Sequence, residues 1–403
     1  MRIGVDATCW ANGRGYGRFT RELLGAMVKG SRQDEFVLFT DDPSAIDLAA
    51  ANVRVVTVPQ SVRSIDAASA EGARSPVDML RFTRAVWREP IDVFFSPSVY
   101  TWFPLPPGRR AVVTIHDAIA ERFPELTLPS ARARLFWRAK VWLALRQSRL
   151  VLTVSGFAAR EIAEVLHVAP ERLRVAGEAP SGAFRPAGRD EILAAARAVG
   201  LPDGARWFTY VGGFNPHKRV DVLVRAHARL TAEMRAAGGA IPYLLLVGRR
   251  SGDAFHGAHA EIERAIESGG AGDFVRWTGF VPDEELRKLH SGARALVLPS
   301  MAEGFGLPAV EAAACGSPVI ATVQSPLPEM LQGGGVFVTP GDEDALLDAM
   351  RLLLDDGERN QMGERGRAAV AALSWRTAAD AALGALREVA RDRATAVVRE
   401  AVA

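Results

Sequence analysis

Short apolar runs alternate with amphipathic stretches in the first half of the 403-residue chain. The runs are rich in Val, Ile, Leu and Phe and are bounded by turn residues, as buried strands are. Such alternation predicts a parallel sheet covered by helices on both faces. The expected strands are residues 3–5, 36–39, 53–58, 93–95, 112–115 and 150–154, and the expected helices are 19–28, 76–87, 128–146 and 158–166.

The same pattern restarts after a polar stretch that contains Gly and Pro, residues 177–186. An inter-domain linker is expected there. We therefore predict two α/β domains, 1–183 and 184–375, which agrees with the chain length. The tail, about 376–403, is Ala- and Arg-rich with apolar residues at helical spacing. The expected strands of the second half are 207–211, 243–247, 275–278, 295–298, 319–321 and 336–338.

Composition is that of an ordinary soluble globular protein, with 48% hydrophobic and 24% charged residues. The apolar runs are too short to span a bilayer, and the first residues read as a strand rather than a signal peptide. The two cysteines, Cys9 and Cys315, lie far apart and indicate no disulfide framework. A cytoplasmic location is therefore expected.

The net charge of +2 hides an asymmetry. Residues 1–200 contain 27 Lys/Arg and 21 Asp/Glu, whereas residues 201–403 contain 22 and 26. A basic first half favours an anionic membrane surface or a phosphate-bearing acceptor. Residues 132–149 mix six basic residues with aromatic and aliphatic ones, as a helix lying on anionic lipid would. Packing of the aromatic face in the core is the favoured interpretation, with peripheral contact at the inner membrane face as the alternative. No nucleic-acid partner is expected.

The most informative segment is 299–318, with the sequence PSMAEGFGLPAVEAAACGSP. A short apolar run precedes it, Pro308 suits the first turn of a helix, and Gly316 suits its C-terminal cap. Glu303 is expected in a strand-to-helix turn and Glu311 about one helical turn later, so both carboxylates can reach the same crevice. There they can accept hydrogen bonds from vicinal hydroxyls of a sugar and a ribose. A plain strand–turn–helix unit, with Glu311 favouring the helix start, is the alternative.

Two glycine-containing turns add candidate phosphate contacts. In WFTYVGGFNPHKR, residues 207–219, backbone N–H groups and Lys218 can both meet a diphosphate. A solvated basic cap is the alternative for this turn. The N-terminal turn NGRGYGRF, residues 12–19, is a weaker signal. A Rossmann dehydrogenase, with Asp41 or Asp42 binding the ribose, is its rival interpretation, but the glycine spacing differs from the dinucleotide pattern.

Two further groups of polar residues follow expected strands or turns. His116 and Asp117 come directly after a buried strand, which would place them at the carboxyl edge of the first sheet. A histidine there is otherwise a structural hydrogen-bonding group. Asp342 and Asp344 fit an Asp-x-Asp metal motif, but they follow Pro-Gly and open a helix, so capping is the preferred interpretation. No His/Cys cluster has zinc spacing, and no metal is expected.

The segment around Glu303 resembles the Glu-x7-Glu signature of retaining nucleotide-sugar glycosyltransferases of family 4. The resemblance extends from Gly13 to about Pro340. It implies the GT-B fold, in which two Rossmann-like domains face each other across a cleft and a C-terminal helix returns to the first domain. A cleft of this kind is expected to close on the donor. An Arg that many relatives place after the first glycine is replaced here by Gly213, and Arg219 or Arg249 is the expected substitute.

The resemblance also implies site residues. Glu303, His116 and Lys218 are the candidate catalytic residues, and Arg18 and Asp117 are candidate acceptor contacts. Backbone groups of the turn before residue 283 are expected to hold the nucleobase. The implied donor- and nucleotide-binding residues are Gly15, Gly17, Gly212, Gly213, Lys218, Arg219, Phe280, Val281, Phe305, Gly306, Leu307 and Glu311.

The function implied is metal-independent, retaining transfer of a hexose from a nucleoside-diphosphate sugar to a hydroxyl of a glycan, lipid-linked or small-molecule acceptor. No cofactor is expected besides this co-substrate. GDP-mannose is favoured as donor, with UDP- and dTDP-sugars as alternatives. A sugar phosphorylase on the same fold and a catalytically silent glycan-binding subunit are the rival functions.

Overall fold

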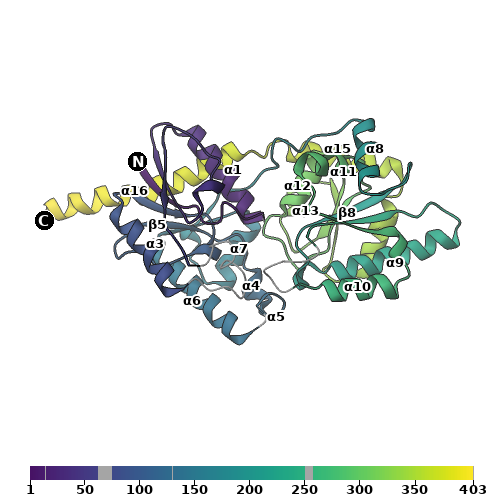
Figure 1. Ribbon diagram of the computed structural model, residues 1–403, viewed down its shortest axis with the longest axis horizontal. Helices are drawn as coiled ribbons and strands as arrows, with labels where there is room; N and C mark the ends of the chain where they lie inside the picture. Colours follow the sequence, from purple (N-terminus) through teal and green to yellow (C-terminus); the bar gives the residue numbers. More distant parts are fainter. Residues whose placement is uncertain (14, 62–74, 129, 250–256, 403) are drawn as a thin grey trace. The chain divides into compact units, whose positions relative to one another are not determined.

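A computed structural model describes residues 1–13, 15–61, 75–128, 130–249 and 257–402, with side chains as far as residue 391 (Figure 1). The chain divides into two compact units. Unit 1 consists of Met1–Glu178 and Trp375–Ala403, and unit 2 of Ala179–Ser374. The division falls within the polar stretch 177–186 and slightly before the boundary expected at residue 183.

Unit 1 is built on a parallel sheet with the strand order β3-β2-β1-β4-β5-β6-β7. Its described strands are β1 (Arg2–Asp6), β2 (Glu35–Thr40), β3 (Val53–Thr57), β4 (Val93–Ser96), β5 (Ala111–Thr114), β6 (Leu150–Thr153) and β7 (Leu173–Val175). Its described α-helices are α1 (Gly15–Gly30), α3 (Pro76–Arg88), α4 (Ile119–Arg122), α5 (Pro124–Thr127), α6 (Ala131–Gln147), α7 (Gly156–Val165) and α16 (Trp375–Val402). Strands β4, β5 and β6 are buried at every residue, as expected of a parallel sheet covered on both faces.

Serine N-caps precede helices α3, α6 and α7 and define the residue at which each helix begins. Ser75, Ser130 and Ser155 each accept a hydrogen bond from the amide three residues later. All three helices contribute side chains to one hydrophobic cluster with β2, β4, β5 and β6. They therefore cover the same face of the sheet.

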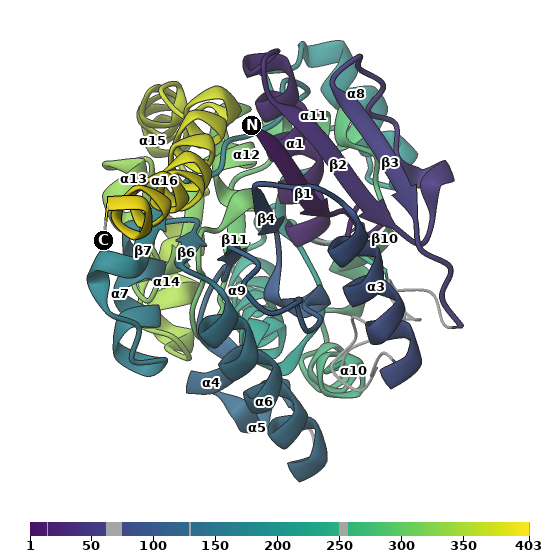
Figure 2. The same ribbon diagram turned by 90° about the vertical axis from the view of Figure 1, so that its left-hand side faces the viewer.

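Helix α16 returns to unit 1 and packs against α1 and strands β4 to β7 (Figures 1 and 2). Two ion pairs fix it. Arg387 lies 2.9 Å from Asp34, and Glu388 lies 2.7 Å from Arg174. The expected return of the C-terminal helix to the first domain is confirmed.

Unit 2 repeats the design with the strand order β10-β9-β8-β11-β12-β13, again in parallel pairs. Its described strands are β8 (Trp207–Val211), β9 (Tyr243–Val247), β10 (Val275–Gly279), β11 (Leu296–Leu298), β12 (Val319–Thr322) and β13 (Gly335–Val338). Its described α-helices are α8 (Arg189–Ala198), α9 (Val220–Ala236), α10 (His259–Ser268), α11 (Asp283–Gly292), α12 (Leu307–Ala314), α13 (Leu327–Leu331), α14 (Glu343–Leu352) and α15 (Asp356–Val370). Two Rossmann-like parallel-sheet units confirm the predicted fold class.

The expectation for residues 132–149 was partly wrong. Helix α6 starts at Ala131, and residue 129 of the expected helix lies outside the described residues. Trp137 is buried, as core packing required, but Leu135, Phe136 and Trp142 are exposed. These three side chains lie on the outer face because the helix buries only the opposite side.

Candidate active site

The order of the strands indicates where unit 2 is expected to bind a ligand. From β8 the chain builds β9 and β10 on one side of the sheet and then continues with β11 on the other side. Loops that leave β8 and β11 therefore diverge, and ligands of such sheets bind at this switch point, beyond the carboxyl ends of the strands. Lys218 follows β8 and Glu303 follows β11.

Lys218 and Glu303 meet at this point. Lys218 Nζ lies 2.8 Å from Glu303 Oε1, and the hydroxyl of Ser300 donates a hydrogen bond to the same oxygen at 2.6 Å. The exposed fractions of the Lys218 and Glu303 side chains are 21% and 11%. The site thus holds a partly buried cation and anion, each oriented by the other.

Backbone hydrogen bonds join the loops that carry this pair. Met301 N donates to His217 O at 2.8 Å, and Glu303 N donates to Gln324 O at 3.0 Å. Between Lys218 and helix α9, Arg219 adopts the left-handed conformation, with φ of 49°. Its guanidinium lies 3.3 Å from Asp221, so the suggested substitute cation already has an anionic partner. Arg249 is described and exposed.

Helix α12 places the second carboxylate. Gly306 precedes it with φ of 82°, and a Cβ there would lie 2.9 Å from a methyl group of Leu327. Both facts favour glycine at this turn. Phe305 and Leu307 are largely buried, and Glu311 is only 3% exposed. Burial, followed by the nearby Glu311 carboxylate, raises the pKa of the Cys315 thiol to about 12.

The glycine pair after β8 is held by a buried tyrosine. The hydroxyl of Tyr210 donates to Gly213 O at 2.5 Å, and a Cβ on Gly212 would lie 3.0 Å from the same hydroxyl oxygen. Tyr210 therefore holds the backbone of this turn on both glycines.

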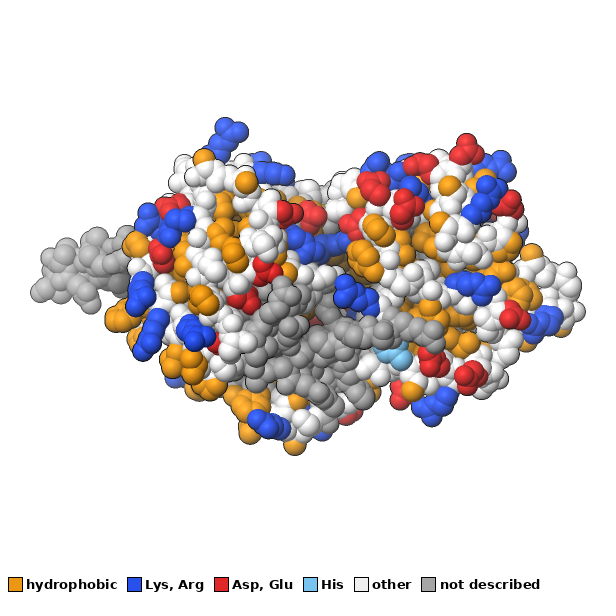
Figure 3. All heavy atoms as spheres, in the orientation of Figure 1, with side chains coloured by type: hydrophobic (Ala, Val, Ile, Leu, Met, Phe, Trp, Pro, Cys, Tyr) orange, Lys and Arg blue, Asp and Glu red, His pale blue; other side chains and the backbone are white. Residues whose placement is uncertain are grey.

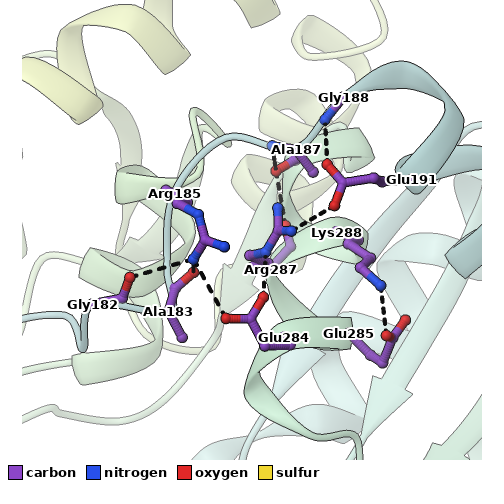
Figure 4. Close-up of polar contacts among 11 residues, drawn as sticks. Gly182, Ala183, Arg185, Ala187, Gly188, Glu191, Glu284, Glu285, Arg287 and Lys288 are labelled. Carbon is purple, nitrogen blue, oxygen red and sulfur yellow. Dashed lines mark hydrogen bonds and ion pairs between the residues drawn. The ribbon is translucent and has the colours of Figure 1, made fainter.

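An ion-pair network anchors helix α11, which follows the turn expected to hold the nucleobase. Arg287 of α11 is 5% exposed and lies 2.6 Å from Glu191 of α8 and 2.8 Å from Glu284 (Figure 4). These contacts anchor the first turn of α11, which begins just after Phe280 and Val281. Phe280 is 69% exposed.

In unit 1, strand order reverses between β1 and β4, and the N-terminal glycine turn follows β1. Gly17 is required sterically, because a Cβ there would lie 2.0 Å from Asn12 O. Gly15 begins α1, and a Cβ there would meet no atom within 4 Å. Residue 14 of this turn lies outside the described residues. Tyr16 stacks on Tyr100 with a centroid distance of 5.4 Å.

His116, at the end of β5, faces protein oxygens with both ring nitrogens. Nε2 lies 3.0 Å from Pro97 O, and Nδ1 lies 3.7 Å from Glu178 Oε1. The carbonyl can only accept, so Nε2 carries a proton. The ring also makes an edge contact with Phe19. His116 is thus oriented by the protein itself, with 13% of its side chain exposed.

Asp117 and Arg18 lie on the same unit. Asp117 Oδ1 accepts from Ile119 N at 3.0 Å and so supports the start of α4, while Arg18 is half-buried. Nearby, burial raises the pKa of Glu121 to about 7, and Trp137 Nε1 donates to its carboxylate at 2.7 Å.

Among the described residues, no group of three or more His, Cys, Asp or Glu side chains could hold a metal ion. Asp342 caps α14 by accepting from Ala345 N at 2.9 Å. The preferred interpretation of Asp342 as a cap is therefore confirmed.

Sequence reasoning overlooked two residues that orient the candidates. Ser300 contacts Glu303, and a Ser three residues before a Glu is a local signal that could have been used. Glu178, the last residue of the first segment of unit 1, lies 3.7 Å from His116 Nδ1. No pattern connects residues 116 and 178, since only the fold brings them together.

The comparisons with known proteins agree with this geometry. The model of Glycosyltransferase Family 4 matches residues 13–177, and the model of Glycosyl transferases group 1 matches residues 193–369. The O-antigen chain mannosyltransferase B of Escherichia coli is 30% identical over 377 residues, covering 90% of this chain and 92% of that protein. The chain therefore belongs to the family 4 glycosyltransferases and is a glycosyltransferase.

Two further similarities are more distant. A D-inositol 3-phosphate glycosyltransferase of a Nocardioides species is 29% identical over 71% of this chain and 61% of that protein. The structure of sucrose-phosphate synthase from Thermosynechococcus elongatus superposes with a TM-score of 0.75 and 22% identity, over 96% of this chain and 98% of that one. The second similarity supports the GT-B fold alone. Within the described residues, no helix has both the length and the apolar character needed to cross a bilayer.

Proposed function

We propose that this glycosyltransferase moves mannose from GDP-mannose to a hydroxyl of a glycan or lipid-linked acceptor, with retention of anomeric configuration and without a metal ion. The observation that carries the proposal is the Lys218–Glu303 pair, 2.8 Å apart at the switch point of unit 2. Lys218 provides a cation for the diphosphate, and the Glu303 carboxylate provides a hydrogen-bond acceptor for the sugar hydroxyls. The name of the Escherichia coli relative supports mannose.

In the proposed reaction, the bound donor breaks the ion pair between Lys218 and Glu303, and each side chain then contacts the donor instead of the other. Lys218 turns to the diphosphate and stabilises the charge that develops on it as the bond from the anomeric carbon to the phosphate oxygen breaks. Glu303, still held by Ser300, accepts hydrogen bonds from sugar hydroxyls. Glu311 of α12 accepts from the ribose, and the Gly212–Gly213 backbone lies beside the phosphates.

Retention follows if the acceptor oxygen approaches the face that the diphosphate leaves. A new bond then forms between that oxygen and the anomeric carbon, and the acceptor proton passes to the leaving phosphate. No side-chain base is needed for this balance. His116, whose Nε2 is bound to Pro97 O, orients the sugar or the acceptor rather than removing the proton. Gly15, Gly17, Arg18 and Asp117 complete the proposed binding residues of unit 1.

Calorimetry with GDP, UDP and dTDP tests the donor assignment and separates the two carboxylates. GDP is expected to bind most tightly. Glu311→Ala should weaken binding of the bare nucleotide, whereas Glu303→Ala should leave it unchanged and reduce turnover of GDP-mannose. Binding of inorganic phosphate and sugar phosphate instead of any nucleotide would favour a phosphorylase. Nucleotide binding without transfer would favour a silent subunit.

Lys218→Ala tests the electrostatic step. It should reduce turnover roughly a hundredfold, which corresponds to about 3 kcal/mol of transition-state stabilisation. Lys29→Ala, an exposed lysine at the end of α1, is the matched control and should change turnover little. Turnover of Lys218→Ala within a factor of about two of the wild type would remove Lys218 from the site.

A further inference from the structure

Helix α6 has an unusual outer face. Its buried side consists of Trp137, Val141 and Ala144. Opposite these lie Leu135 and Trp142, seven residues apart, which are 68% and 61% exposed, and Phe136, at the side of the helix, is 52% exposed. A surface helix normally presents polar residues to water on this side. The outward face of α6 instead mixes exposed apolar and aromatic side chains with arginines.

The charged residues of α6 itself are all basic. Residues 131–149 contain Arg132, Arg134, Arg138, Lys140, Arg146 and Arg149. The chain has no Asp or Glu between Glu125 and Glu161. The guanidinium of Arg132 lies 5.4 Å from the Phe136 ring, and that of Arg146 lies 5.6 Å from the Trp142 ring. Cations thus flank the exposed aromatic rings.

Helix α3 repeats the pattern. Leu80 and Trp87 are 56% and 71% exposed on one face, with exposed Arg84 between them. The acidic residue of this helix, Asp78, is buried and accepts from Ser61. Both helices pack into the same core cluster, so their outer faces belong to the same side of unit 1.

A short segment joins the two helices. The hydroxyl of Thr83 in α3 donates to Pro104 O at 2.6 Å, and Leu105 N donates to Gln147 Oε1 of α6 at 3.0 Å. In Figure 3, orange and blue side chains lie next to one another on the part of unit 1 where Figure 1 places α3 and α6. We call the outer faces of these helices the basic–aromatic surface, defined by Leu80, Arg84, Trp87, Arg132, Leu135, Phe136, Arg138, Trp142 and Arg146.

We propose that the basic–aromatic surface docks on an anionic lipid bilayer. Transfer of Trp, Phe and Leu side chains from water to the boundary between headgroups and acyl chains lowers the free energy of the system. Arginine guanidinium groups at the same surface can extend to lipid phosphates. Exposed apolar groups interspersed with arginines match that boundary, in which anionic phosphates lie directly above hydrocarbon. The assignment goes beyond the transfer reaction and does not depend on the donor site.

Vesicle flotation tests this proposal with the 403-residue chain. The probe is vesicles of phosphatidylcholine and phosphatidylglycerol at roughly three to one, compared with phosphatidylcholine alone. Binding should be at least about tenfold stronger to the anionic vesicles and should weaken as salt rises. Phe136→Ser with Trp142→Ser, and separately Arg132→Gln with Arg146→Gln, should each lower the partition coefficient about tenfold.

Leu352→Ser with Arg264→Gln alters an exposed leucine and an exposed arginine of unit 2 and serves as the matched control, with no expected change. Because every substituted side chain is exposed, the unfolding midpoint should stay constant, and the arginine pair provides a second variant if the serine pair does not fold. Equal binding of all variants would overturn the proposal, as would equal binding to neutral vesicles. A concentration-dependent dimer that the serine pair abolishes would assign the surface to a second copy of the chain instead.

Discussion

At the scale of single residues, the candidate site balances its own charge. Lys218 and Glu303 are both partly buried, and removal of either would leave the other without its ion-pair partner in a site of reduced exposure. Ser300 keeps one hydrogen bond to Glu303 in either case. We propose that these same two side chains contact the diphosphate and the sugar of the donor.

Glu121 provides a residue-scale prediction about pH. Burial raises the pKa of its carboxyl to about 7, above the ordinary value of 4.5. Between these values the folded state holds a proton that the unfolded state releases, so the free energy of unfolding decreases as pH rises through this window. The decrease should be on the order of 2–3 kcal/mol. Urea unfolding at a series of pH values from about 5 to 8 measures it.

Glu121→Gln is the appropriate comparison because the amide keeps an oxygen that can accept from Trp137 Nε1. The variant should lose the decline between these pH values, and the wild type should be the less stable of the two near pH 8. Parallel stability curves for the two proteins would show that Glu121 titrates normally.

At the scale of elements, the N-terminal glycine turn permits a paired test. Gly17→Ala places a Cβ against the backbone oxygen of Asn12, at 2.0 Å without relaxation, and the turn or the first turn of α1 must shift. We expect a loss of about 1–3 kcal/mol in the free energy of unfolding. Gly15→Ala meets no atom within 4 Å and should be neutral or slightly stabilising, because alanine favours helix. Equal thermal shifts in the two variants would refute this steric account.

Most elements were predictable from the sequence, because parallel strands buried on both faces read as short apolar runs. All the strands expected in both halves are present, and the tail forms α16. Strand β7 was missed, since its three residues include a charged arginine and it lies at the sheet edge. The short helices α4 and α5 were missed because four residues carry no helical periodicity.

The candidate site was predictable only where its residues share a local turn. Glu303 and Glu311 belong to one strand–turn–helix segment, so spacing alone related them. The contact between Lys218 and Glu303 joins residues 85 positions apart, and only the strand order brings them together. The exposed face of α6 was misjudged for a related reason. Apolar residues occur on all sides of α6, so the periodicity of the sequence does not show which side packs against the core.

At the scale of the whole molecule, the two halves differ in charge, with a balance of +6 over residues 1–200 and −4 over residues 201–403. The basic half contains the basic–aromatic surface, and the other half carries the proposed donor site. If both proposals hold, attachment to lipid and binding of the nucleotide use different units. Variants of one should then leave the other unchanged, since sites without shared contacts usually behave additively.

The last prediction concerns the cations that the complete reaction needs. In the proposed mechanism, the leaving diphosphate is stabilised by Lys218 and by backbone N–H groups beside it, which is the work a divalent ion performs in other transferases. Transfer of mannose from GDP-mannose should therefore continue in excess EDTA, at a rate within about twofold of that with added magnesium or manganese. The matched measurement uses Lys218→Ala under both conditions, to see whether a metal ion compensates for the lost charge. Loss of wild-type transfer in EDTA, restored by either metal, would contradict the mechanism and return attention to Asp342 and Asp344.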